Sequence, residues 1–161
     1  MTLSKLEIKI DGLIDDLNKK DKNISKSVDG IPDLPYENFE TLMADLRIGK
    51  ARLLRFSFAL ESNLFSLIAK PSEKFSNNFG MIIAYGGILA SIGVSYFVSW
   101  WLLVLIPIVF VVGNRIVKRS YNSAILRTAA TSELLFCFLY FAGQVSIDLP
   151  SAGEHYYYKR E

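Results

Sequence analysis

One stretch of the chain, from Phe75 to Asn114, contains no charged residue and no histidine. Lys74 precedes this stretch and Arg115 follows it, so charge stops abruptly at both ends. The stretch is about 40 residues long, and as a helix it would reach roughly 60 Å, twice the hydrocarbon thickness of a bilayer. It therefore predicts two membrane-crossing helices joined by a tight turn, near Phe79–Val98 and Trp100–Val117.

The centre of this apolar stretch is aromatic, which is typical of the boundary between a bilayer and water. The residues expected to anchor the turn at that boundary are Tyr96, Trp100 and Trp101. The residues expected to contact lipid headgroups at the far end of the stretch are Arg115, Lys118 and Arg119. Positive charge stays on the cytoplasmic side, so the chain is predicted to lie in the cell inner (plasma) membrane with both termini cytoplasmic.

The first predicted span is rich in small residues spaced by four positions, which let helix backbones approach closely in lipid. The candidate packing residues fall on two adjacent stripes, with Gly86 and Ala90 on one and Gly87, Ser91 and Ser95 on the other. Two interpretations stay open. The small residues pack against the second span of the same chain, or they pack against a neighbouring copy in a homo-oligomer.

The second predicted span is bulkier and is expected to face lipid. Pro107 lies near its middle, where a proline leaves the carbonyl of Leu103 without its helical donor. The proline predicts a kink, which is either simply tolerated or serves as a gating hinge.

These patterns predict an all-α integral membrane protein, in which a transmembrane helical hairpin carries a cytoplasmic helical bundle. The bundle would be formed by the N-terminal helices and by the extension of the second span. The expected segments are an amphipathic helix with a linker (1–35), a long cytoplasmic amphipathic helix (36–74), the transmembrane hairpin (75–118), a cytoplasmic helix (119–149) and a tail (150–161).

Apolar residues recur every three or four positions in Leu3–Lys20, which predicts an amphipathic helix. This helix either lies on the rest of the domain or forms a short coiled coil. The same spacing predicts a long helix over Tyr36–Ala69, and the apolar segment Leu134–Phe141 is expected to pack on it. A third span over Thr128–Ile147 is the alternative for that segment.

Glu133 precedes the apolar Leu134–Phe141 segment and would need a partner there, because a buried carboxylate without one is costly. The cations expected to pair with it are Arg52, Arg55 or Arg127.

The sequence predicts no catalytic, cofactor-binding or metal-binding residue. His155 is the only histidine, and Cys137, the only cysteine, lies in a phenylalanine-rich run that is typical of an inert core position. The chain is therefore expected not to be an enzyme. Its expected partners are membrane lipids, further copies of itself and a protein that binds its cytoplasmic helices, rather than nucleic acid.

In layout the chain resembles the bacterial two-helix membrane effectors called SLATT-type, in which a transmembrane hairpin joins cytoplasmic helices. That family is thought to form pores when triggered, and the resemblance implies the same layout here while transferring no site residue. Two functions therefore stay open. One is a self-associating membrane protein whose cytoplasmic helices control association and a pore, and the other is a membrane-anchored adaptor.

Overall fold

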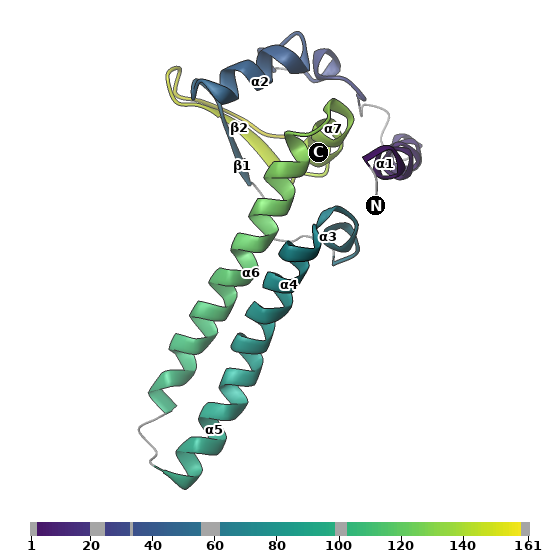
Figure 1. The fold of residues 1–161 in the computed structure, drawn as a ribbon. Helices are drawn as coiled ribbons and strands as arrows, with labels where there is room; N and C mark the ends of the chain where they lie inside the picture. The colour runs from purple at the N-terminus through teal and green to yellow at the C-terminus, as the bar shows by residue number, and fades with distance from the viewer. Residues whose placement is uncertain (1–2, 20–24, 33, 56–61, 99–102, 159–161) are drawn as a thin grey trace. The chain divides into compact units, whose positions relative to one another are not determined.

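The computed structural model describes residues 3–19, 25–32, 34–55, 62–98 and 103–158, and it is mostly helical with one small sheet (Figure 1). The chain divides into two compact units. Unit 1 comprises Met1–Ile68 together with Ile125–Glu161, and unit 2 comprises Ala69–Ala124.

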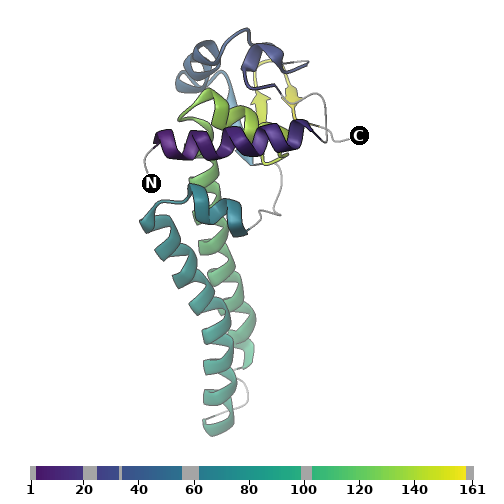
Figure 2. The ribbon, with the colours of Figure 1, turned by 90° about the vertical axis from the view of Figure 1, so that its right-hand side faces the viewer.

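Unit 2 is a pair of antiparallel helices. Its first arm is one continuous helix of 27 residues, formed by α4 (Pro71–Met81), the π-helical turn η2 (Ile82–Gly86) and α5 (Gly87–Phe97). Its second arm is the part of α6 (Leu105–Ala129) that ends at Ala124. The two arms run side by side in both views (Figures 1 and 2).

Unit 1 surrounds the short apolar helix α7 (Glu133–Phe141), in which every residue from Leu135 to Phe141 is buried. The helix α1 (Leu3–Asn18) lies beside α7 and contributes Ile10 and Ile14 to the core (Figure 2). The helix α2 (Phe39–Arg47) lies near α7 as well, with the rings of Phe39 and Phe136 6.1 Å apart. Two shorter elements complete the helical part of the unit, η1 (Val28–Gly30) and α3 (Ser62–Ile68).

The sheet has three antiparallel strands in the order β1 (Arg52–Arg55), β2 (Val145–Leu149) and β3 (Glu154–Tyr156). Leu53 lies opposite Ile147 in the register of β1 and β2, and Ile147 lies opposite Tyr156 in that of β2 and β3. The expectation of an all-α fold is therefore wrong, although the fold is mostly helical.

The predicted helix of residues 36–74 is wrong, because the chain stops being helical at Gly49. This glycine follows the last residues of α2 and has a φ of 77°. The N–H of Lys50 donates to the carbonyl of Asp45 at 2.9 Å, and the N–H of Gly49 donates to Leu46 at 3.4 Å. This is a Schellman motif, which ends a helix by satisfying its last carbonyls. The chain continues as β1, and α3 and α4 follow as separate helices.

The predicted continuous helix after the hairpin also ends early, because α6 stops at Ala129 and α7 begins only at Glu133. A second Schellman motif ends α7 at Gly143, whose φ is 65°. The segment Thr128–Ile147 is thus not one helix, and a third span there is wrong. The predicted tail is also wrong in part, because β3 forms within residues 150–161 and pairs with β2.

The amphipathic N-terminal helix is confirmed as α1, and it lies on the rest of unit 1. Its buried face differs from the one that the spacing of Leu3, Leu6, Ile10, Leu13 and Leu17 predicts, because Leu3 is 45% exposed. Ile14 is fully buried, whereas the neighbouring Leu13 is 39% exposed.

Candidate functional site

The two arms of unit 2 are in contact where glycines, which have no side chain, let the backbones approach. A Cβ on Gly80 would lie 3.0 Å from the carbonyl oxygen of Gly113, and a Cβ on Gly113 would lie 2.6 Å from the backbone nitrogen of Ala84. Real Cβ atoms essentially never come closer than 3.0 Å to another atom of this kind. The backbones of α4, η2 and α6 therefore meet directly at Gly80, Ala84 and Gly113, as small residues in helix pairs allow.

The predicted stripe of Gly87, Ser91 and Ser95 continues this contact face. A Cβ on Gly87 would overlap a γ-methyl of Val109 and lie 3.4 Å from the Val109 Cβ. Ser91 and Ser95 are partly buried on the same side of α5. The hydroxyl of Ser95 donates to the carbonyl of Ile92 at 2.8 Å, so it is satisfied within its own helix.

The other predicted stripe, Gly86 and Ala90, faces away from α6. Both residues are exposed, and a Cβ on Gly86 would meet only a methyl group of Ile82 at 3.8 Å. Gly93 extends this outward stripe, and a Cβ there has nothing within 4 Å among the described residues. The structure thus separates the two stripes, one inward and one outward.

The second arm was expected to face lipid, and its contact with the first arm at Gly113 was not predicted. Gly113, Ser120 and Ala124 are buried and follow one another at intervals of seven and four positions. That spacing of small residues marks one face of a helix, and it is the signal by which the contact face of α6 was predictable.

One end of the helix pair is polar and is held by Glu73, which is only 9% exposed. One carboxylate oxygen accepts a hydrogen bond from the backbone N–H of Lys70 at 2.7 Å, and this caps the start of α4. The other accepts one from the hydroxyl of Ser123 on α6 at 3.2 Å. One turn further, the buried side-chain oxygen of Asn77 has no hydrogen-bond partner within the part of the chain that the structure describes.

The remaining predicted residues lie apart from this contact face. Pro107 is the third residue of α6, a first-turn position where a missing N–H leaves no bond unmade, so no kink in mid-helix is seen there. Tyr96 is 86% exposed at the end of α5. Trp100 and Trp101 lie outside the described residues. The basic residues Arg115, Lys118 and Arg119 are exposed on α6.

The surface of the helix pair is strongly apolar on its outward sides. The 27-residue arm Pro71–Phe97 is long and apolar enough to cross a membrane, and only 17% of its most apolar window is buried. The large exposed apolar side chains of unit 2 are Phe75, Phe79, Met81, Ile82, Tyr85, Leu89, Ile92, Val94, Tyr96, Phe97, Val98, Leu103, Val104, Leu105, Ile108, Phe110, Val111 and Val112.

In unit 1, polar contacts hold the segment after α1 in place. Lys26 pairs with Asp11 at 2.6 Å and with Asp15 at 2.8 Å, and hydrogen bonding to Asp11 and then Asp15 raises the Lys26 pKa. Glu133 accepts a hydrogen bond from the N–H of Val28 at 2.8 Å. Arg127, one of its predicted partners, donates to the carbonyl of Ile68 at 3.0 Å, at the end of α3.

The chemically reactive side chains of the described residues do not form a reactive site. Cys137 is buried, and burial, followed by the charge of Glu133, raises its pKa from 9.0 to about 12. The thiol is therefore protonated at neutral pH. The described residues hold no group of three His, Cys, Asp or Glu side chains arranged to bind a metal ion.

Comparison with protein-family models, with curated proteins and with solved structures finds no match to this chain. The physical properties of the two units are therefore the basis for a function.

Proposed function

We propose that this chain is a non-enzymatic integral membrane protein of the bacterial inner-membrane type, which crosses the bilayer as a helical hairpin and self-associates there. The observation that carries the proposal is the exposed apolar surface of unit 2. Soluble monomers rarely expose contiguous apolar patches of more than a few hundred Å², whereas here large apolar side chains point outward along both arms. Lipid or a second copy would cover such a surface.

The charges of unit 2 support a membrane location and predict where the bilayer boundary lies. Gly80 packs against Gly113 and Val117, so Arg115 lies level with the residues that follow Gly80. Both arms are free of charge together only from about Ile82 to Phe97, roughly 24 Å of helix. This is shorter than a typical hydrocarbon core of about 30 Å. Arg115, Lys118 and Arg119 would then extend their long side chains to the headgroups.

Self-association is supported by the outward stripe. The inward stripe is occupied by α6 of the same chain, whereas Gly86, Ala90 and Gly93 present a row of small residues against which the described part of the chain places no helix. A helix from a second copy can approach closely along such a row. Two helices cannot enclose water, so any pore would be built from several copies.

Two measurements test this proposal. Membranes from expressing cells are washed with alkaline carbonate, and the protein is expected to remain in the membrane pellet. The mass of the solubilised protein, corrected for bound detergent, is expected to exceed that of one chain. Ala90→Leu, on the outward stripe, should lower this mass, whereas Val111→Leu, at an exposed position on α6, should leave it unchanged.

Release into the carbonate supernatant would contradict the membrane location. A one-chain mass for the unmodified protein would contradict self-association. Purified protein in dye-loaded liposomes then separates the two roles that remain, since a pore releases the dye and an anchor does not.

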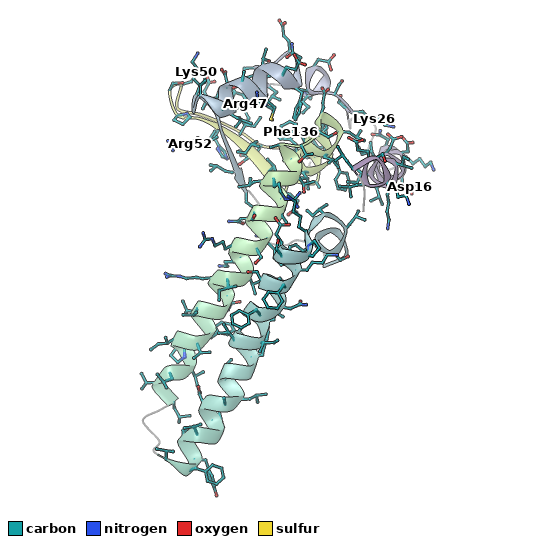
Figure 3. The ribbon with its side chains drawn as sticks, in the orientation of Figure 1. Asp16, Lys26, Arg47, Lys50, Arg52 and Phe136 are labelled. Atoms are coloured by element: carbon teal, nitrogen blue, oxygen red, sulfur yellow. The ribbon has the colours of Figure 1, made fainter. Side chains whose placement is uncertain are left out.

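The second candidate function, a membrane-anchored adaptor, is favoured by a cationic corner on unit 1. Arg47, Lys50 and Arg52 are all exposed and gather where α2 ends and β1 begins (Figure 3). Ile48, 64% exposed, lies among them. A corner with three cations and an exposed apolar side chain fits an acidic protein partner. Lys50→Glu combined with Arg52→Glu should abolish cross-linking to such a partner and leave membrane insertion unchanged.

A further inference from the structure

The first arm of unit 2 contains one turn of π-helix, η2, between two stretches of α-helix. A π-turn accommodates one residue more than the α-helical turn it replaces. Such turns are rare in proteins, and those that occur are often found at functional positions. This one lies where the backbones of the two arms meet. Ala84, at its centre, is 1% exposed and lies against Gly113.

The two small-residue stripes of α5 differ by one residue in register. The inward stripe is Gly87, Ser91 and Ser95, and the residues one position earlier are Gly86, Ala90 and Val94. Successive residues of an α-helix are about 100° apart around its axis. If η2 became α-helical, α5 would therefore turn by about one residue relative to α4. Gly86, Ala90 and Val94 would then take the places of Gly87, Ser91 and Ser95.

We propose that η2 is a register switch, which places either Gly87 and Ser91 or Gly86 and Ala90 against α6 by converting between π-helix and α-helix. Its first requirement is that both registers pack against α6. The residue opposite Val109 must be a glycine, because a Cβ there would overlap a methyl group, and both registers supply one, Gly87 or Gly86. The residue that follows by four positions is small in both, Ser91 or Ala90.

The second requirement is that the helix before the turn stays in place. Glu73 fixes the start of α4 through Lys70 and Ser123, and Gly80 lies against the backbone of Gly113. These contacts precede η2, so a change of register in η2 turns α5 and leaves α4 held. Interfaces with two discrete packings are the usual basis of such conformational switches.

The consequence concerns which side chains α5 presents outward. In the π register these include Gly86 and Ala90. In the α register Tyr85 and Leu89 take their places. Ser91 and Ser95 move to the exposed places of Ile92 and Tyr96, so the surface gains two hydroxyl groups. Any effect of this exchange on a neighbouring copy rests on the proposed self-association. The switch itself lies within one chain and is tested there.

The test is disulfide formation between α5 and position 109 in the full-length protein, with Cys137→Ala to remove the native thiol. Three pairs are compared, each with Val109→Cys: Gly87→Cys, Gly86→Cys and Tyr85→Cys. In the π register the Cβ separation at the first pair is 3.4 Å, within reach of a disulfide. Tyr85 is exposed and does not face α6 in either register, so its pair measures chance collisions.

The Gly87 and Gly86 pairs are both expected to cross-link, each faster than the Tyr85 pair. Deletion of Ile83 removes the extra residue of the π-turn and should lock the present register. It is therefore expected to abolish the Gly86 cross-link and retain the Gly87 cross-link. The proposal is overturned if the Gly86 pair reacts no faster than the Tyr85 pair, or if its cross-link survives the deletion. Neither result depends on whether the protein self-associates.

Discussion

Gly113 and Ala84 meet backbone to backbone, since a Cβ added to Gly113 would lie 2.6 Å from the Ala84 nitrogen and 2.7 Å from its Cβ. This contact joins α6 to the π-turn of the opposite arm. It has no room for a side chain, so the packing of unit 2 depends on glycine at position 113.

Gly113→Ala is expected to destabilise the helix pair by about 1–3 kcal/mol, because the added methyl must displace backbone atoms. Gly12→Ala is the matched control, since Gly12 also lies within a helix, α1, but has open space around it. That change should be neutral or stabilising by up to about 1 kcal/mol, from helix propensity alone. Thermal unfolding in detergent measures both, and equal effects would rule out a dedicated contact at Gly113.

Glu73→Ala is expected to destabilise unit 2 by about 1–3 kcal/mol, because it leaves the Lys70 N–H and the Ser123 hydroxyl without their acceptor. Lys74→Ala, at the exposed neighbouring position, is the control and should change stability little. Hydrogen exchange at the first turn of α4 should accelerate in the Glu73 variant alone. Unchanged exchange there would mean that Glu73 does not cap the helix.

Phe136→Ala is expected to cost about 3–5 kcal/mol, because Phe136 is fully buried at the centre of unit 1. Ile8→Ala, on the outer face of α1 where Ile8 is 73% exposed, should be close to neutral. Denaturant unfolding followed by far-UV circular dichroism measures both. A mild effect at Phe136 would indicate that α7 lies in lipid, as a membrane segment, instead of in a protein core.

Stability is expected to fall as pH rises from 9 toward 12. In the folded protein the pKa of the Cys137 thiol is about 12, whereas in the unfolded chain it is near 9.0. The stability that the protonated thiol contributes is therefore fully present below pH 9 and is lost as the pH rises from 9 toward 12. Burial, with the nearby Asp45, raises the pKa of Tyr36 from 10.0 to about 12 and acts in the same direction.

Cys137→Ala should therefore lessen the loss of stability above pH 9, and Tyr36→Phe should lessen it above pH 10. The check is the unfolding temperature of each variant across this pH range. Curves parallel to that of the unmodified protein would show that neither group titrates with unfolding.

The helical character of most segments was predictable, because it follows from local periodicity. The spacing of apolar residues from Leu3 predicted α1, but it placed Leu3 and Leu13 on the buried face and left out Ile14, which faces the core. The small residues of the first arm predicted a contact face. Which of its two stripes faces inward depends on the π-turn, and no local pattern identifies that turn.

One strand of the sheet has a sequence pattern that was not interpreted as a strand. The segment Val145–Leu149 reads apolar, polar, apolar, polar, apolar between Gly143 and Pro150, which is a strand pattern bounded by turn residues. Its partner Arg52–Arg55 has no such alternation. That strand depends on the left-handed Gly49, which ends α2, and on pairing with a segment almost one hundred residues away in sequence.

The central claim is that unit 2 crosses the membrane with both of its ends on the same side, and cysteine accessibility tests it most directly. Single cysteines at Ser4, Val98 and Ser151, each with Cys137→Ala, are exposed to an impermeant maleimide in spheroplasts. All three positions are exposed in the structure. Val98 is expected to be labelled from outside, and Ser4 and Ser151 only after the membrane is permeabilised. Labelling of Ser151 from outside, or protection of Val98 until permeabilisation, would contradict the hairpin topology.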